Sequence, residues 1–184
     1  MTARNVLFLC THNSARSILA EAILNSKGGD RFRAYSAGSA PGGAPNPDGL
    51  ALLAERGHPI DGLYSKSWDA FAAPGAPEMH IIITVCDNAA GESCPLWPGR
   101  PASAHWGIAD PSTVSGDETP RRAAFARAYD LLEQRIDRLL SLSDGLEGPA
   151  LKRALAEIGS DSEGLRRNHA LLQHCRSRRP QPIE

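Results

Sequence analysis

Runs of apolar residues separate the chain into segments that read as buried strands. Near-continuous runs predict strands over residues 4–10 and 79–86, because the strands of a parallel sheet are covered on both faces. Two shorter runs predict further strands over residues 32–38 and 102–108. We therefore expect at least four strands in the first 110 residues.

Between these runs, apolar positions recur every three or four residues, as on one face of a helix. This spacing predicts helices over residues 16–27, from Asn46-Pro47 to Gly57, and from Thr119-Pro120 to near Ser141. Strands that alternate with helices favour right-handed crossovers. The pattern thus predicts an open, doubly wound α/β fold with a parallel sheet.

The last part of the chain has a different pattern. Gly148-Pro149 precedes two short helical patterns, and the charges that follow are mixed in sign, which argues against a tail for nucleic acid. We predict one domain over residues 1–144 and a C-terminal helical extension over 145–184, whose role and whose Cys175 stay unassigned. Because no catalytic motif lies in the extension, truncation after Asp144 is expected to keep turnover within a few-fold.

Composition narrows the class of protein. The chain has 184 residues and a net charge of −1, which fits one domain and gives no general case for nucleic-acid or membrane partners. No apolar run approaches the roughly 18 residues of a transmembrane helix, and no signal peptide is expected. Four cysteines are too few for a disulfide framework, so we expect a reducing, cytoplasmic location.

The candidate chemistry lies between the first strand and the first helix, where Cys10 and Arg16 form a C-x5-R motif. A loop leading into a helix aims backbone N–H groups at one point, and the arginine fork matches a tetrahedral oxyanion. The same positive field favours the thiolate of Cys10, which Ser17 can stabilise by a hydrogen bond. The predicted oxyanion-binding residues are Thr11, His12, Asn13, Ser14, Ala15, Arg16 and Ser17.

Two more candidates follow other predicted strands. Cys86 and Asp110 each lie at or just past a strand end, as Cys10 does. Ligands of open α/β sheets bind at the carboxyl ends of strands, so we expect these three residues on one edge. Neither a G-x-G-x-x-G fingerprint nor a Walker motif is present, which argues against dinucleotide and P-loop nucleotide sites.

In this order, the motifs resemble a known family. Cys10 to Ser17, Ser36-Ala37-Gly38 and Asp110-Pro111 resemble the low-molecular-weight protein tyrosine phosphatases. Within that fold, the chain resembles the arsenate reductases of the thioredoxin-coupled type, through Thr84-Val85-Cys86, Cys94-Pro95 and His105 to Pro111. The resemblance covers residues 4–142 and implies an open four-stranded parallel sheet flanked by helices.

The resemblance implies a role for each matching residue. Cys10 would be the nucleophile, Arg16 the oxyanion clamp and Asp110 the general acid, while Asn13 would hold the loop shape. Reduction of arsenate to arsenite, as in arsenic detoxification, would proceed through a disulfide relay of Cys10, Cys86 and Cys94. The implied reductant is thioredoxin, a glutaredoxin with glutathione, or a mycothiol-type system, and phosphate or sulfate would compete with arsenate.

The resemblance also implies a potassium ion beside the loop, as the sole cofactor. Oxygen donors suit such a cation, and the matching positions are Asn13, Glu21, Ser36, Ser67 and Asp69. An alternative is that Glu21 is a solvated helix residue or pairs with a nearby base.

Two other functions are compatible with the residues. A protein tyrosine phosphatase needs only Cys10, Arg16 and Asp110, although Ser112-Thr113-Val114 stand where such phosphatases usually carry aromatic residues. The Cys86–Cys94 pair favours the reductase. A zinc site made by Cys86, Cys94, His80 and His105 is a weaker alternative, because the cysteine spacing is not that of a structural zinc site.

Overall fold

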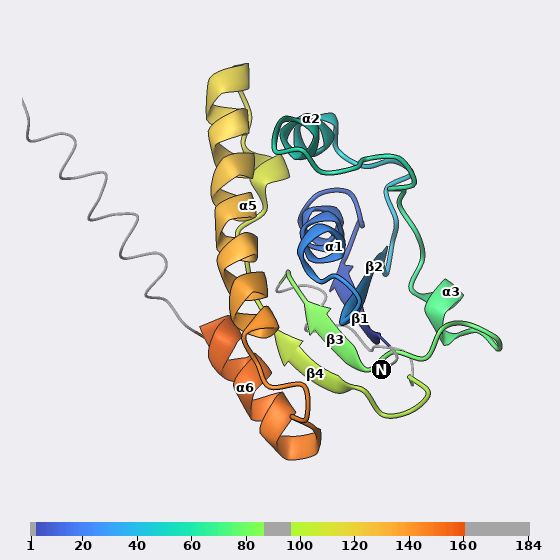
Figure 1. Cartoon of the computed structure of the whole chain (residues 1–184). Helices are drawn as coiled ribbons and strands as arrows, with labels where there is room; N and C mark the ends of the chain where they lie inside the picture. The colour runs from blue at the N-terminus through green and yellow to red at the C-terminus, as the bar shows by residue number, and fades with distance from the viewer. Residues whose placement is uncertain (1–2, 87–96, 161–184) are drawn as a thin grey trace, which may run out of the picture.

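The computed structural model describes residues 3–86 and 97–160, and it confirms the predicted parallel sheet. Four strands run in the order β2-β1-β3-β4, and every neighbouring pair is parallel (Figure 1). The strands are β1 (Arg4–Cys10), β2 (Phe32–Gly38), β3 (Ile81–Thr84) and β4 (Ala102–His105). The carboxyl ends of all four strands therefore meet at one edge of the sheet.

The predicted helices are present with nearly the predicted bounds. Asn46 caps the second helix as expected, because its side chain accepts a hydrogen bond from the amide of Asp48 at 2.9 Å. The helices are α1 (Arg16–Lys27), α2 (Pro47–Glu55), α3 (Asp69–Ala72), α5 (Glu118–Leu140) and α6 (Gly148–Ser160), with a 3₁₀ turn η1 (Pro111–Thr113).

Strands β3 and β4 are shorter than their apolar runs. Single hydrogen bonds extend the pairing beyond the regular strands: Val85 donates to the carbonyl of Leu9 at 2.8 Å, and Ile108 donates to the carbonyl of Val85 at 3.1 Å. The apolar runs thus include backbone that stays in the plane of the sheet beyond the regular strand pairing. The chain that follows β3 and β4 is held at the carboxyl edge.

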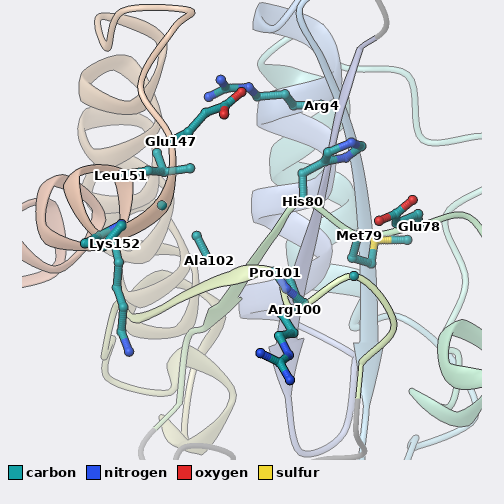
Figure 2. Close-up of a pocket in the computed structure, with 13 residues that line it drawn as sticks. Arg4, Glu78, Met79, His80, Arg100, Pro101, Ala102, Glu147, Leu151 and Lys152 are labelled. Atoms are coloured by element: carbon teal, nitrogen blue, oxygen red, sulfur yellow. The ribbon is translucent and has the colours of Figure 1, made fainter.

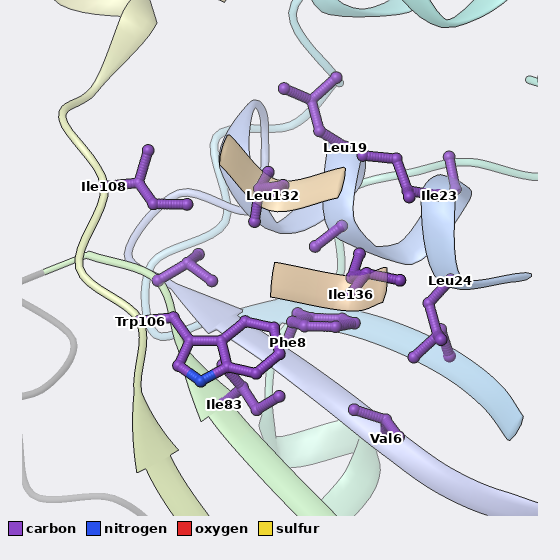
Figure 3. Close-up of a cluster of buried hydrophobic side chains, with 14 of the residues drawn as sticks. Val6, Phe8, Leu19, Ile23, Leu24, Ile83, Trp106, Ile108, Leu132 and Ile136 are labelled. Carbon is purple, nitrogen blue, oxygen red and sulfur yellow. The ribbon is translucent and has the colours of Figure 1, made fainter. Parts of the chain in front are cut away.

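Alternate residues of β1 divide the core into two layers. Val6, Phe8 and Cys10 face the larger cluster, to which α1, α5 and α6 contribute. Figure 3 shows its central part, with Phe8 between side chains of α1 and α5. Leu7 and Leu9 face a smaller cluster on the other side of the sheet. Its further members are Ala37, Met79, Ile82 and Phe71 of α3. The central strand is thus buried on both faces, as its unbroken apolar run predicted.

Helix α6 lies beside the edge strand β4 and against the end of α5 (Figure 1). Leu151, Leu155 and Ile158 recur along one face of this helix and belong to the larger core cluster. The first part of the predicted extension is therefore packed on the sheet layer. The second helical pattern of the extension, with Cys175, lies outside the described residues.

Within residues 3–86 and 97–160, no helix is both long enough and apolar enough to cross a membrane.

Candidate active site

The segment between β1 and α1 forms a tight loop around the sulfur of Cys10. Three backbone carbonyls of the loop point outward, toward the segment that follows β2. They accept hydrogen bonds at 2.8 to 2.9 Å from backbone amides of that segment: Thr11 from Ala40, His12 from Gly42 and Ser14 from Asn46. The N–H groups of a peptide point opposite to its carbonyls, so this loop presents amides on its inner side. It has the geometry of an anion-binding site, as the C-x5-R motif predicted.

Close approach of β2 to the loop requires a glycine. A Cβ atom on Gly38 would lie 2.4 Å from the carbonyl oxygen of Thr11 and 2.9 Å from the amide nitrogen of Asn13. No larger residue fits without moving backbone. The glycine of the Ser36-Ala37-Gly38 motif is therefore needed on steric grounds, because it lets β2 pack directly against the loop.

Asn13 fixes the conformation of the loop from beneath. It is fully buried and has a positive φ of 47°, a conformation that asparagine tolerates better than most residues. Its Nδ2 donates to Ser17 Oγ at 3.0 Å and to Ser36 Oγ at 2.8 Å, and its Oδ1 accepts from the Lys66 amide at 2.7 Å. Asn13 thus joins the loop to α1, β2 and the segment after α2, which supports its predicted role in holding the loop shape.

The sulfur of Cys10 receives hydrogen bonds suited to a thiolate. The Asn13 amide donates to it at 3.1 Å, and Ser17 Oγ lies 2.9 Å away. Because Ser17 Oγ already accepts from Asn13, its own hydrogen is available to Cys10. Two donors therefore converge on the sulfur of Cys10, a residue that is only 4% exposed.

Arg16 and Asp110 meet at the mouth of the loop. Arg16 Nη2 donates to Asp110 Oδ2 at 2.6 Å, and Nη1 donates to the carbonyl of Ile108 at 2.9 Å. The other Asp110 oxygen caps η1, accepting from the Ser112 amide at 3.0 Å and its hydroxyl at 2.6 Å. The predicted clamp and the predicted acid are thus adjacent, although they are far apart in sequence.

A second cysteine lies against the same loop. Cys86 is 3% exposed, and its Sγ is 3.6 Å from the hydroxyl oxygen of Thr11, the residue after Cys10. Cys10 and Cys86 are not disulfide-bonded. The prediction that β1 and β3 bring these cysteines to one edge is confirmed, while Cys94 lies outside the described residues.

The predicted potassium ligands fall into two hydrogen-bonded groups, one of which links Asn13, Ser36 and Glu21. Glu21 is 8% exposed; it accepts a hydrogen bond from Ser36 and lies 3.3 Å from Lys66 Nζ. Ser67 instead donates to Asp69 at 3.0 Å as a separate pair. A fixed ammonium already neutralises Glu21, so these donors do not fit a cation in the present arrangement. The paired state of Glu21 matches the alternative interpretation, with Lys66 as the base that sequence reasoning did not name.

The remaining candidate side chains do not gather at one site. His12 is exposed, and its backbone belongs to the loop around Cys10. His80 precedes β3, whereas Cys86 follows it, so these two zinc candidates lie at opposite ends of one strand. Among the described residues, no group of three or more His, Cys, Asp or Glu side chains is arranged to hold a metal ion.

A cavity of about 400 Å³ lies at the other edge of the sheet (Figure 2). Arg4, His80 and Ala102, which line it, stand at or just before the amino ends of three strands. Ligands of open α/β sheets bind at the carboxyl ends, where Cys10 is. This cavity is therefore separate from the candidate active site.

The chain is similar to proteins of one family. The family model described as low molecular weight phosphotyrosine protein phosphatase matches residues 5–155. An arsenate reductase of Bacillus licheniformis is 35% identical over 138 residues, which are 75% of this chain and 96% of that protein.

Solved structures agree with this similarity. An arsenate reductase from Archaeoglobus fulgidus superposes with a TM-score of 0.54 at 29% identity, over 72% of this chain and 98% of that one. A thioredoxin-dependent arsenate reductase of Corynebacterium glutamicum has a TM-score of 0.54 at 26% identity over 75% of this chain. The present chain spans 60% of the length of that second protein.

Proposed function

The chain belongs to the low molecular weight phosphotyrosine protein phosphatase family, and from that premise we propose that it is an arsenate reductase. One observation carries the choice within the family: Cys86 Sγ lies 3.6 Å from Thr11, inside the loop that surrounds Cys10. Hydrolysis of a phosphate ester needs one thiol and water, whereas reduction of arsenate needs a second thiol within reach. The names of the relatives support the same choice.

The first step forms a bond between Cys10 and arsenic. The Cys10 thiolate attacks the arsenic of arsenate, and one As–O bond breaks. Arg16 releases the carboxylate of Asp110 and binds the oxyanion in its place. Its planar guanidinium can donate two parallel hydrogen bonds to that oxyanion. Asp110, freed from Arg16, then acts as the general acid and gives a proton to the departing oxygen.

The second step transfers two electrons to arsenic. The Cys86 thiolate attacks Cys10 Sγ and forms a disulfide, and the S–As bond breaks with its electron pair left on arsenic, which leaves as arsenite. Cys94 then attacks Cys86 and frees Cys10, and an external dithiol reduces the Cys86–Cys94 disulfide. The dependence of the Corynebacterium glutamicum relative on thioredoxin supports a thioredoxin-type donor. The proposed location is the cytoplasm, where thiols stay reduced.

A second candidate function is hydrolysis of phosphotyrosine. The Arg16–Asp110 pair and the Cys10 loop are sufficient for ester hydrolysis through a phosphocysteine, and the family description names this activity. Phosphate and sulfate, which share the shape of arsenate, are the expected competitors in either reaction.

The deciding experiment compares Cys86→Ser with the wild type in two assays. We expect the variant to lose arsenate reduction with thioredoxin, glutaredoxin plus glutathione, and mycothiol-type donors, while hydrolysis of a phosphotyrosine mimic persists. Cys10→Ser is the matched control and should abolish both activities. Wild-type arsenate turnover by Cys86→Ser with every donor would contradict the relay and favour the phosphatase.

The third cysteine is tested separately. Cys94→Ser should permit one turnover and then trap a Cys10–Cys86 disulfide, which mass spectrometry detects after proteolysis. Formation of a disulfide requires Cα atoms within about 7 Å, so this product also shows that the two strand ends approach during the reaction. If Cys94→Ser turns over repeatedly with a small thiol alone, that thiol replaces Cys94.

A further inference from the structure

The end of α6 is in close contact with the loop that carries Asp110. We call residues 106–110, between β4 and η1, the acid loop. A Cβ atom on Gly159, in the last turn of α6, would lie 2.2 Å from the His105 carbonyl oxygen and 2.6 Å from Cδ1 of Trp106. The backbone of α6 therefore touches the beginning of the acid loop.

Two side chains bond the acid loop to α6. Trp106 is fully buried beside Phe8 (Figure 3), and its indole Nε1 donates to the carbonyl of Leu155 at 2.9 Å. Arg135 of α5 donates from Nη1 to the Gly107 carbonyl at 3.2 Å and from Nη2 to the Gly159 carbonyl at 3.1 Å. One guanidinium thus joins the end of α6 to the middle of the acid loop.

Arg135 is unusual because its charge is buried without an acid. It is 6% exposed, its Nε has no hydrogen-bond partner, and none of the ion pairs within the described residues includes it. Burial lowers the pKa of its guanidinium, and the charge of Arg138 adds to this effect. The groups that stabilise this cation are carbonyls, and Gly159 belongs to the negative end of the α6 dipole.

The remaining backbone bonds of the acid loop lead to the active site. Trp106 donates to the Thr84 carbonyl at 2.7 Å, which continues the sheet. The Ile108 carbonyl accepts from Arg16, which also holds Asp110. Helix α6 therefore bonds the acid loop at Trp106 and α5 bonds it at Gly107, while the other bonds of the loop reach Thr84, Val85 and Arg16.

We propose that α6 positions the acid loop, with Arg135 and Trp106 as the positioning residues that connect it to Asp110. Helix α6 is then part of the catalytic architecture through its contacts with the acid loop. The proposal rests on the proposed function in one respect only, the role of Asp110 as the general acid.

The test compares Arg135→Met with Arg127→Met, an exposed arginine of the same helix. Hydrogen exchange followed by mass spectrometry measures opening of the acid loop in the folded protein. Loss of bonds to a charged donor should speed exchange at residues 106–110 by about tenfold or more, with the amides of β1 unchanged. Arg127→Met should match the wild type, and Arg135→Lys, which keeps the charge but reaches one carbonyl, should fall between.

Trp106→Phe is the second variant, since it removes the indole donor and keeps most of the ring. It should also speed exchange in the acid loop, which keeps the test decisive if Arg135→Met does not fold. Exchange that is unchanged in the acid loop of both variants, or that rises equally in β1, would overturn the proposal. In the latter case Arg135 contributes only to global stability.

Activity gives an independent readout. Arg135→Met should lower kcat for arsenate about tenfold while the Kd for inorganic phosphate stays within about twofold, because the Cys10 loop does not contact Arg135. Equal loss of phosphate binding and turnover would contradict a positioning role. If the wild type does not reduce arsenate at all, the proposed function fails, yet the exchange measurement still decides the role of α6.

Discussion

At the scale of single residues, the conformation of the loop around Cys10 is fixed by the hydrogen bonds of a few buried polar side chains. Asn13 holds the loop in a left-handed turn and uses its amide on Ser17, Ser36 and the Lys66 backbone. The chain of bonds continues from Ser17 to Cys10 and from Ser36 to Glu21. The sulfur of Cys10 therefore belongs to a hydrogen-bond network that reaches α1, β2 and the segment after α2.

Asp110→Asn tests the predicted acid. The amide keeps the shape and can still cap η1, but it has no carboxyl proton to give to the leaving oxygen, so kcat should fall by about 10²–10⁴-fold. Phosphate binding should persist, because Arg16 no longer has an ion pair to break before it binds the oxyanion. Steady-state kinetics and calorimetry measure the two effects. Undiminished turnover would show that another group protonates the oxygen.

Lys66→Met tests whether the ammonium takes the place of a cation beside Glu21. The variant leaves a nearly buried carboxylate without its partner at 3.3 Å, so the Tm should fall and should rise again when potassium replaces tetramethylammonium in the buffer. The wild type should show no such difference. Lys152→Met, at an exposed position, is the control. A potassium effect of equal size in the wild type would restore the ligand set predicted from sequence.

At the scale of elements, the sequence patterns predicted β1, α1 and β2 at the observed bounds. This was possible because the spacing of apolar residues and the glycines that end an element can be read within each segment alone. The short α3 has four residues, too few for a helical period to show. The Arg16–Asp110 ion pair and the Lys66–Glu21 pair join distant segments, so the pairs themselves become visible only in the folded chain.

His58 links α1 to α5 and should make their packing sensitive to pH. Its Nδ1 lies 2.8 Å from Ser26 Oγ of α1 and its Nε2 lies 2.6 Å from the Tyr129 hydroxyl of α5. Burial lowers the pKa of His58 below 6.5; Glu133 opposes this shift, and Lys27 and Arg56 add to it.

Because the unfolded chain then binds a proton more readily than the folded one, this contribution to stability is present above about pH 6.5 and is lost as the pH falls through the lower folded value. Urea unfolding between about pH 5 and pH 8 should show the loss in the wild type. His58→Gln keeps polar contacts but does not titrate, so it should show a flatter profile. Parallel profiles for the two proteins would exclude His58 as the cause.

At the scale of the whole molecule, the parallel sheet explains why sequence alone was enough to gather the site. Because the strands are parallel, one edge of the sheet holds the strand ends at Cys10 and Thr84 and the acid loop after β4. This placement does not depend on how the helices pack. The contribution of α6 was not predictable in the same way. Its pattern of Leu151, Leu155 and Ile158 indicates an amphipathic helix but not the surface that it covers.

Truncation after Asp144 measures what α6 contributes to the molecule. The sequence pattern led us to expect an extension that is dispensable for turnover, whereas the packing of α6 leads to the opposite expectation. Without α6, the indole of Trp106 loses its acceptor, the guanidinium of Arg135 loses the Gly159 carbonyl, and apolar surface beside β4 is exposed.

Loss of a hydrogen bond to a charged donor alone costs about 1.5–3 kcal/mol, so the truncated chain should lose at least this much unfolding free energy in urea. Truncation after Ser160 is the control, because it keeps all of α6, and it should retain both stability and turnover within a few-fold. If the chain ending at Asp144 is as stable and as active as the chain ending at Ser160, then Arg135 finds other partners. In that event the domain boundary predicted from sequence is also the functional one, and α6 covers the sheet edge without acting on the acid loop.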